Sequence, residues 1–432
     1  MQRLRNWLYP KTLHELKQIN KLRQSGFNVP SVATHLKNGA CSALATQAIE
    51  PARELNEIEK PDQANIMLEM AYQFISRGFI HEDMHAGNIL LDTSDTPFLV
   101  DCYEIKQVSE PSDKQIIAMF GQIVSLYNIP DEILNKYLAK LLPDSDYEKM
   151  ISTTRNLAKK FKRSRIKRWI KRSLRNGSFS RKVSTPESTA WINRKHDIDV
   201  LELIRQHKEN LNNNRNILKK QEKTQLSLVG KYCIKSYKAP NQFQKPYAIR
   251  AWEGLLRLYF NDYFVPDPVS AIVFRDKSSA LITKALDLPS LDKLLYHEDK
   301  TLQTSAKHRL AGSLGAMIGQ MHAGGIYHAD LKACNILVEI KEGKLYLLDT
   351  DRVACQTSLN SRRRLKNLVQ INNSIPKKIS RTLRMRFLNS YAKITQDDAK
   401  KLFRLVWDAA RGIEIVFTTD SGDQVDRWDQ RF

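Results

Sequence analysis

The sequence predicts a mixed α+β fold made of two related modules in tandem. The chain has 432 residues, enough for two domains that each bury a core. A ten-residue motif occurs twice, at residues 81–90 and 328–337. Each copy follows a segment with helical periodicity and precedes a short apolar segment typical of a strand. Helix, loop and strand therefore recur in the same order in both halves.

The two copies of the motif share their polar positions. Both have the pattern His-x-Asp-x-x-x-x-Asn, and in both an apolar strand follows that ends in aspartate, Asp101 or Asp349. The first Asp of the motif precedes this strand Asp by 18 residues in one copy and 19 in the other. Kinase-like phosphotransferases place their catalytic base and metal ligands in this way. We therefore predict two protein-kinase-like modules, residues 1–160 and 161–432.

The elements before each motif also recur in one order. Apolar positions at helical spacing, followed by glycine or Val-Pro, indicate helices, and short apolar runs indicate strands. The expected helices cover residues 11–23, 64–77, 247–259 and 311–322, and the expected strands residues 43–46, 231–235 and 280–283.

The two modules differ in their first lobe. The second contains a strand that ends in Lys235, the form of the strand whose lysine contacts ATP phosphates. Residues 217–228 precede it and are expected to form the hairpin over the nucleotide without a glycine-rich loop. Only ten residues precede the first helix of module one, so we expect this module to lack most of its N-lobe, either natively or because the true start lies upstream.

Phosphoryl transfer needs positioned charge more than covalent chemistry, and the second motif supplies it. Asp330 would orient or deprotonate the acceptor hydroxyl, and Lys332 would reach the transferring phosphoryl group. Asn335 and Asp349 would hold Mg²⁺, which prefers oxygen ligands. Lys235 would contact the α- and β-phosphates of ATP.

The first motif retains equivalents of three of these residues. Asp83 corresponds to the catalytic base, and Asn88 and Asp101 correspond to the metal ligands. Metal binding without efficient transfer is the expectation for this module, because its phosphate lysine is missing. In the second motif, His328 is expected to support the loop backbone.

The helix acid that pairs with the strand lysine in kinases has two candidates. Glu253 would pair with Lys235 in the second module, and Glu15 is the candidate in the first. Aligned on the Val-Pro that follows each helix, however, Glu15 falls opposite Ala251 and Glu253 opposite Lys17. Two positions on a helix differ by about 200°, so both acids cannot face the same way.

The chain carries a formal net charge of +22, which implies an anionic partner. Twelve Lys or Arg and no acid occur in residues 159–182. This segment is either a solvated linker helix or an amphipathic helix on an anionic membrane. Nucleic acid is not an expected partner, because no recognised binding motif accompanies the charge.

The sequence also argues against a membrane-spanning protein, an exported protein and a structural zinc site. No apolar run is long enough to span a bilayer, and no apolar export segment follows the first residues. The five cysteines form no C-x-x-C pair, which favours a reducing compartment and no structural zinc.

With these residues in hand, the chain resembles the bacterial lipopolysaccharide core kinases, the Kdo/heptose kinase family of the protein-kinase-like superfamily. The likeness covers most of residues 165–400 and, more weakly, residues 10–105. The segments that carry it are residues 168–176, 327–337, 347–353, 362–372 and 386–391.

The resemblance implies ATP- and Mg²⁺-dependent phosphorylation of a Kdo or heptose hydroxyl of the lipopolysaccharide inner core. It places the protein in the cytoplasm, peripherally on the inner membrane, with an anionic glycolipid as substrate. Arg362, Arg363, Arg364 and Lys366 are candidates for contacting this glycolipid, or form a solvated helix face. The alternatives are a tandem pseudokinase scaffold that binds an anionic glycolipid or protein, and a protein kinase or nucleotidyl transferase on the same fold.

Overall fold

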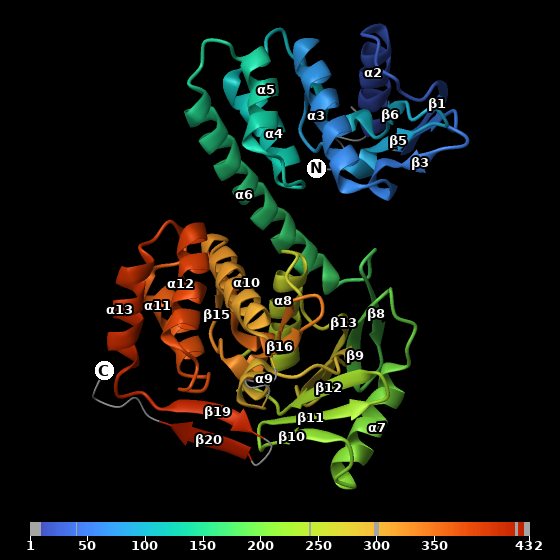
Figure 1. Ribbon diagram of the computed structural model, residues 1–432. Helices are drawn as coiled ribbons and strands as arrows, with labels where there is room; N and C mark the ends of the chain where they lie inside the picture. The colour runs from blue at the N-terminus through green and yellow to red at the C-terminus, as the bar shows by residue number, and fades with distance from the viewer. Residues whose placement is uncertain (1–9, 40, 242, 298–301, 420–421, 427–432) are drawn as a thin grey trace. The chain divides into compact units, whose positions relative to one another are not determined.

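Helices and strands are mixed along the whole chain, so the predicted α+β class is confirmed (Figure 1). The chain divides into two compact units, an N-terminal unit, Met1–Arg165, and a C-terminal unit, Ile166–Phe432. None of the helices described is long and apolar enough to cross a membrane. The computed structural model describes residues 10–39, 41–241, 243–297, 302–419 and 422–426.

The N-terminal unit begins with helix α2 (Lys11–Gln24), close to the predicted bounds. The antiparallel hairpin of β1 (Val32–Asn38) and β2 (Cys41–Thr46) follows it. The remaining elements are β3 (Arg53–Glu54), α3 (Lys60–Ser76), β4 (Phe79–His81), β5 (Ile89–Leu91), β6 (Pro97–Leu99), β7 (Ile105–Gln107), α4 (Asp113–Val124) and α5 (Asp131–Leu141). Strand β5 pairs with β3 and β6, and β4 pairs with β7.

The C-terminal unit begins with a seven-stranded antiparallel sheet in the order β10-β11-β12-β14-β13-β9-β8. Its strands are β8 (Ser180–Ser184), β9 (Ser188–Asn193), β10 (Ile217–Lys220), β11 (Thr224–Val229), β12 (Tyr232–Tyr237), β13 (Pro268–Phe274) and β14 (Ser279–Lys284). Helix α7 (Val200–Asn212) and helix α8 (Tyr247–Tyr259) pack on this sheet. The hairpin expected at residues 217–228 is β10–β11, whereas β8, β9 and α7 were not predicted.

A mainly helical part follows the sheet in the C-terminal unit. Its long helices α10 (Thr304–Ala323) and α12 (Arg381–Thr395) lie side by side (Figure 1). The other elements are α9 (Leu291–His297), β15 (Ile326–His328), β16 (Ile336–Glu339), β17 (Lys344–Leu347), β18 (Val353–Cys355), α11 (Ser361–Asn372), α13 (Ala399–Ala410), β19 (Ile415–Thr419) and β20 (Gly422–Asp426).

Both units contain the same small framework around the repeated motif. The strand before each motif pairs with a later strand, β4 with β7 and β15 with β18, and two short strands after the motif form a hairpin, β5–β6 or β16–β17. The Asp that follows each hairpin has left-handed backbone geometry, with φ of 58° at Asp101 and 52° at Asp349. The sequence repeat is therefore also a structural repeat.

A glycine between helix and strand is required at the same place in both units. Gly78 and Gly325 each have φ of +75°, which favours glycine. A Cβ atom would lie 2.7 Å from the oxygen of Val108 at Gly78, and 2.1 Å from that of Gln356 at Gly325. These turns lead directly into the strands that end at the motif histidines, so the glycines help to place the loops.

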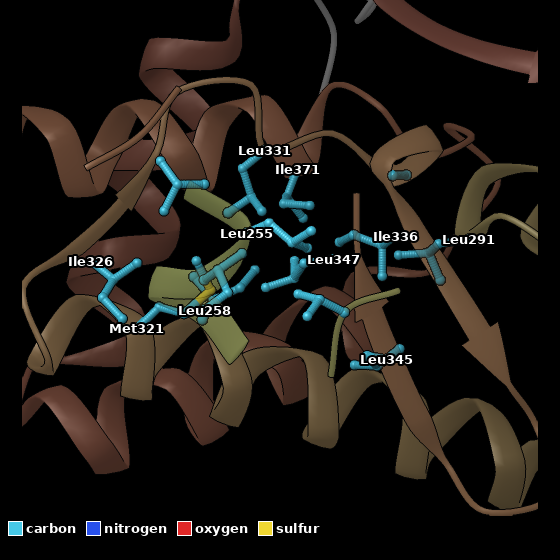
Figure 2. Close-up of a cluster of buried hydrophobic side chains, with 14 of the residues drawn as sticks. Leu255, Leu258, Leu291, Met321, Ile326, Leu331, Ile336, Leu345, Leu347 and Ile371 are labelled. Carbon is cyan, nitrogen blue, oxygen red and sulfur yellow. The ribbon is translucent and has the colours of Figure 1, made fainter. Parts of the chain in front are cut away.

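The core of the C-terminal unit holds its motif in place (Figure 2). Leu331 lies inside the motif and is fully buried, and so is Ile336, which follows the motif Asn. Both pack in one cluster with Ile371 of α11 and with Leu347, which precedes the strand Asp by two residues. Hydrophobic packing therefore fixes the backbone on both sides of the polar motif residues.

The basic segment is helical only in part. Helix α6 (Tyr147–Ser173) contains its first residues, and the chain then turns into β8. Ile166 and Ile170, one helical turn apart, are buried in the core of the C-terminal unit, and Trp169 lies against Phe260 with ring centroids 5.2 Å apart. This part of α6 is thus packed on the unit and is not a solvated linker helix.

Candidate active site

The motif of the C-terminal unit presents its polar side chains between buried neighbours. Leu331 and Ala333 are fully buried, whereas the side chains of Asp330 and Lys332 are 37% and 49% exposed. The Lys332 ammonium lies 3.0 Å from a carboxylate oxygen of Asp330. An acid and a base at hydrogen-bond distance are thus presented together at the surface of the motif.

Asn335 is oriented by the backbone and side chain of Asp330. Its amide nitrogen donates to the Asp330 carbonyl at 2.9 Å and to the Asp330 carboxylate at 3.2 Å. The Leu348 N–H donates to the Asn335 carbonyl at 2.9 Å, which joins the motif to the strand that leads to Asp349. Because the amide nitrogen is engaged, the side-chain oxygen is the atom that Asn335 offers to a cation.

His328 holds the loop backbone, as predicted. It is fully buried, and its Nε2 lies 2.8 Å from the carbonyl oxygen of Leu348. Burial lowers the pKa of His328 below its ordinary value, so the ring is neutral at pH 7 and donates from Nε2 to this carbonyl. Such a ring fixes geometry but is poorly placed to exchange protons with solvent.

Two amide side chains of α11, which were not predicted from the sequence, support the same loop. Asn367 donates to the carbonyl of His328 at 2.7 Å, and Gln370 donates to the carbonyl of Ala329 at 2.9 Å. The Asn367 side-chain oxygen in turn lies 3.2 Å from Nε2 of buried His322. A fully buried Asn on the apolar face of a helix is a recognisable signal, since such a group needs partners.

Lys235 and Asp349 meet although 114 residues separate them in the sequence. The Lys235 ammonium contacts Asp349 directly and lies 3.3 Å from a carboxylate oxygen of Asp351. The Tyr237 hydroxyl donates to Asp351 at 3.2 Å. Asp351 and Tyr237 were not among the predicted site residues. Tyr237 is two residues after Lys235 on β12, so both side chains point to the same face of the sheet.

Opposite charges decide how this cluster ionises. Burial lowers the pKa of Lys235, but Asp351 and Asp349 outweigh burial and the net shift is upward. Burial raises the pKa of Asp349, but Lys235 outweighs it and brings that pKa below its ordinary value. Burial and the neighbouring Asp349 carboxylate leave the pKa of Asp351 raised. A charged lysine beside an ionised Asp349 is the state expected at neutral pH.

The predicted pairing of Glu253 with Lys235 is not found. Glu253 instead accepts from the Lys245 ammonium with both carboxylate oxygens, at 2.7 and 2.9 Å. Lys245 lies just before α8, and the two residues are eight positions apart. The physical reason is the orientation of α8, which packs on the strand end through Ala251 and Gly254 and turns Glu253 away from Lys235.

The motif of the N-terminal unit has the same backbone arrangement with looser side-chain contacts. The Val100 N–H donates to the Asn88 carbonyl at 2.8 Å, as in the other unit. The Asn88 amide, however, lies 3.5 Å from the carbonyl of Asp83, at the limit of a hydrogen bond. Asp83 and Asp101 are both exposed. These three predicted residues therefore share one loop region, in a more open arrangement.

The N-terminal unit differs most where the lysine strand would lie. In the C-terminal unit, β14 pairs with β13 on one side and with β12, which carries Lys235, on the other. Among the described residues of the N-terminal unit, the corresponding strands β1 and β2 pair only with each other. The described part of this unit thus contains no strand that brings a lysine to Asp101.

A hollow of about 580 Å³ opens beside the motif of the C-terminal unit. Lys332 lines it together with Arg362 and Lys366 of α11. Its apolar lining consists of Leu365, Val369, Ala409, Ile413 and Val416. Glu414 also lines the hollow, but its single negative charge is outnumbered by the three cations. Cationic side chains beside an apolar wall suit an anionic molecule that also has an apolar face.

The four basic residues of α11 that were predicted to contact an anionic glycolipid fall into two pairs. Arg362 and Lys366, one turn apart, are exposed and line this hollow. Arg363 lies over the ring of Tyr327, 5.2 Å from its centroid, and Arg364 pairs with Asp397. The structure thus brings only the first pair to the hollow beside the motif.

The donor set of the site fits Mg²⁺ better than a softer metal. The candidate ligands, the Asn335 amide oxygen and the Asp349 carboxylate, are hard oxygen donors. In the described part of the chain, no group of three or more His, Cys, Asp or Glu side chains could hold a metal. Two protein ligands are the usual number for Mg²⁺ at nucleotide sites, where substrate phosphates and water supply the rest.

Residues 214–404 match the model of the lipopolysaccharide kinase (Kdo/WaaP) family. The chain is similar to that family over this segment. The segment includes β10 to β14 and the motif of the C-terminal unit, and therefore Lys235, Asp330, Asn335 and Asp349. The resemblance stated from the sequence is confirmed for residues 214–404, which match a family of kinases. No curated protein sequence matches the chain.

Solved structures of kinases and phosphotransferases are similar to the chain over less than half of its length. The bifunctional kinase-methyltransferase WbdD is 12% identical over 43% of this chain and 47% of its own, with a TM-score of 0.30. The chain thus spans about half of WbdD. A type VIII aminoglycoside-3'-phosphotransferase is 12% identical over 47% of this chain and 98% of its own, at 0.34. The CAK complex of Chaetomium thermophilum is 15% identical over 45% and 72%, at 0.29.

Proposed function

We propose that the chain transfers the γ-phosphate of ATP to a Kdo or heptose hydroxyl of the lipopolysaccharide inner core, with the chemistry in the C-terminal unit. The observation that carries the proposal is the assembly of Lys235 with Asp349 and of Asp330 with Asn335 and Lys332, all inside the segment that matches the family. The N-terminal unit repeats the loop, but its described residues include no strand that corresponds to β12 and brings a lysine to Asp101.

Each side chain has one task in this proposal. Asp330 orients the acceptor hydroxyl and accepts its proton as the oxygen attacks the phosphorus atom. Lys332, 3.0 Å from Asp330, stands beside the transferring phosphoryl group and balances its charge. Lys235 holds the α- and β-phosphates, while Asn335 and Asp349 would hold Mg²⁺. When bound, Mg²⁺ neutralises the charge that develops on the phosphate oxygens.

The hollow beside the motif is the proposed acceptor site. Its cations Arg362 and Lys366 would bind an acidic group of the inner core, either a carboxylate or a phosphate. The apolar wall formed by Leu365 and Val369 would pack against the carbon face of a sugar ring. Lys332 belongs both to the hollow and to the motif, and it lies 3.0 Å from Asp330. An acceptor bound in the hollow would therefore lie close to Asp330.

Contact with an anionic membrane surface is part of the proposal. Lys167, Arg168, Lys171 and Arg172 of α6 are exposed, and the side chain of Trp169 among them is 38% exposed. Each basic residue near an anionic leaflet adds about 1 kcal/mol to binding. Such contact would hold the kinase, in the cytoplasm, against the inner membrane that carries its glycolipid acceptor.

The test is phosphate transfer from labelled ATP·Mg²⁺ to a lipopolysaccharide that consists of lipid A and an unphosphorylated Kdo–heptose core. The expected product is heavier by one phosphate. A gain of one nucleotidyl group would replace the proposal by a nucleotidyl transferase, and transfer to protein alone would replace it by a protein kinase.

Two further measurements separate the acceptor site from the scaffold alternative. Arg362→Gln with Lys366→Gln should raise the KM for lipopolysaccharide at least ~10-fold with little change in the KM for ATP, since each charged contact contributes about 1.5–3 kcal/mol. Arg386→Gln, an exposed arginine of α12, is the matched control. A non-catalytic scaffold instead predicts no thermal shift with ATP·Mg²⁺, whereas binding at 100 times Kd stabilises by about 2.7 kcal/mol.

A further inference from the structure

We infer that Asp351, and not an acid of helix α8, is the positioning residue that orients Lys235 toward the nucleotide phosphates. The inference rests on the proposed use of Lys235 and adds to it the source of the lysine's orientation. It also implies that the site is assembled without movement of α8, since the lysine, its acid and the metal ligand Asp349 are joined without that helix.

The contacts of Lys235 carry the first step. Its ammonium lies between Asp349 and Asp351, with the two oxygens of Asp351 at 3.3 and 3.5 Å. The side chains of Lys235 and Asp351 are only 20% and 22% exposed, so water screens this pair little. With Asp349 holding a cation and the lysine holding phosphates, Asp351 would remain as the carboxylate beside the lysine.

Tyr237 holds Asp351 in this position. Its buried hydroxyl donates to an Asp351 oxygen at 3.2 Å, and the Lys235 ammonium lies over the Tyr237 ring, 5.2 Å from the centroid. The Tyr237 ring also stacks on Tyr247 at the start of α8, with centroids 6.0 Å apart. Asp351 is thus fixed by a strand residue of the same sheet that carries the lysine.

Helix α8 is packed so closely that Glu253 cannot reach Lys235 by a small adjustment. A Cβ atom at Gly254 would lie 1.9 Å from the carbonyl oxygen of Thr350, which shows how near the helix backbone approaches the segment between Asp349 and Asp351. The Thr350 hydroxyl donates to the Ala251 carbonyl at 2.9 Å. Because adjacent helix residues point about 100° apart, bringing Glu253 to Lys235 would require rotating α8 out of these contacts.

A second, independent observation comes from comparing the two units, because each has an acidic residue at a position where the other has none. The backbone carbonyl of Ala251 accepts from Thr350 at the strand end of the C-terminal unit, and Glu15 holds the aligned position in the N-terminal unit. Helix α2 packs against the turn Cys102–Glu104, and the Glu15 carboxylate accepts a hydrogen bond from the backbone of Cys102, the residue that follows the strand-end Asp of its own unit. In the position two residues after that Asp, the C-terminal unit has Asp351 and the N-terminal unit has Tyr103.

This exchange gives each unit one acid near its strand-end Asp, supplied by different elements. The unit with a helix acid has an aromatic residue in the strand-end position, and the unit with the lysine has alanine on the helix. An acid in both positions of the C-terminal unit would place three carboxylates around one lysine, which is electrostatically unfavourable. The missing helix acid is therefore a consequence of Asp351 and not a defect of the site.

The experiment compares Asp351→Asn with Glu253→Gln in the full chain. Asparagine keeps the size of the side chain but removes its charge. We expect Asp351→Asn to raise the KM for ATP and lower kcat, together ~10²-fold in kcat/KM, because displacing a group by about 1 Å can cost that much. Glu253→Gln should change both constants less than 2-fold. Asp276→Asn, an exposed acid in the β13–β14 turn, is the matched control.

A purely structural role for Asp351 predicts lower thermal stability with unchanged kinetic constants per folded molecule, and this result would overturn the inference. Loss of activity in Glu253→Gln with normal activity in Asp351→Asn would overturn it as well. If Asp351→Asn does not fold, Tyr237→Phe replaces it, with a smaller rise expected in the KM for ATP. Asp351→Glu should restore part of the activity that asparagine loses.

ATP·Mg²⁺ binding, measured by thermal shift without acceptor, separates this inference from the proposed function. If no phosphate reaches lipopolysaccharide but Asp351→Asn still weakens ATP binding, the acceptor is wrong and the lysine assignment stands. If lipopolysaccharide is phosphorylated and Asp351→Asn binds ATP and turns over like the original chain, the assignment to Asp351 is wrong and the function stands.

Discussion

Replacing Gly254 by alanine should damage the active site more than it damages the fold. The new Cβ atom would lie 1.9 Å from the carbonyl oxygen and 3.0 Å from the carbonyl carbon of Thr350. Real Cβ atoms essentially never approach closer than 3.0 Å, so helix or strand end must move by about 1 Å. Thr350 lies between Asp349 and Asp351, and the displacement therefore acts on the two residues that contact Lys235.

Two opposing effects set the size of the change in stability. Overpacking typically costs about 1–3 kcal/mol. Alanine gains about 1 kcal/mol over glycine in a helix interior. The net loss in unfolding free energy is then about 0–2 kcal/mol, whereas a displacement of about 1 Å at reacting groups can cost ~10²-fold in rate. Activity per folded molecule should therefore fall much further than stability.

The assay measures thermal unfolding and steady-state phosphate transfer for Gly254→Ala and two matched variants. Gly315→Ala makes a comparable clash, 2.1 Å from the oxygen of Phe387, between α10 and α12 and away from the lysine cluster. Gly312→Ala meets only Ser390 at 3.5 Å, an ordinary contact. Only Gly254→Ala should lose kcat/KM per folded molecule. Full activity in a folded Gly254→Ala protein would refute the account of how α8 positions the strand end.

Three further predictions concern other contacts in the two units. Gly78→Ala and Gly325→Ala should each lower the melting temperature, because the left-handed turn and the nearby carbonyl leave no room for Cβ; a melting temperature equal to the original would contradict this. Burial lowers the pKa of His207 to about 4, so its neutral ring stabilises the fold above pH 6.5 and this contribution is lost as the pH falls toward 4. His207 should therefore make the protein about 2 kcal/mol less stable at pH 5 than at pH 7, and His207→Gln should not show this loss. The melting temperature of the variant should depend less on pH over this range. Asn367→Leu leaves the His328 carbonyl without its donor, so it should cost about 1–3 kcal/mol in unfolding free energy and lower kcat as well; an effect on stability alone would separate loop support from catalysis.

Much of the C-terminal unit could be predicted because its signals are local. Helix α8 has the predicted bounds, Tyr247–Tyr259, since its apolar spacing and the following Val-Pro are both read within one short segment. Strand β12 was predicted from its lysine, although it extends two residues beyond Lys235, and the repeated motif predicted the loop in both units. Local patterns of this kind need no knowledge of what packs against them.

The elements that were missed have weaker or misleading local signals. Strand β8, Ser180–Ser184, is an edge strand with a basic sequence, and it continues the basic segment that was interpreted as one helix. Charged residues are common on edge strands because they prevent pairing with other chains. Helix α7 is the exception, because its buried residues Val200, Ile204, His207 and Leu211 follow a helical spacing that could have been recognised in the sequence.

Several residues of the site were predicted, but the residues that they contact were not. Lys235 and Asp349 were both named, yet nothing local indicates that Asp351 would join them across 116 residues. The pairing of Glu253 was inferred from its place on a helix, and one helical position decides which way a side chain faces. Orientation of this kind comes from the packing of Gly254 and Ala251, which becomes visible only in three dimensions.

The central claim is that phosphate transfer occurs in the C-terminal unit and not in the N-terminal unit. The most direct test measures transfer from ATP·Mg²⁺ to lipopolysaccharide by Asp330→Ala and by Asp83→Ala, the same substitution in the two copies of the motif. Loss of the base should lower kcat at least ~10²–10⁴-fold in Asp330→Ala. Asp83→Ala should retain most of the original rate. Full activity in Asp330→Ala, or its loss in Asp83→Ala alone, would contradict the claim.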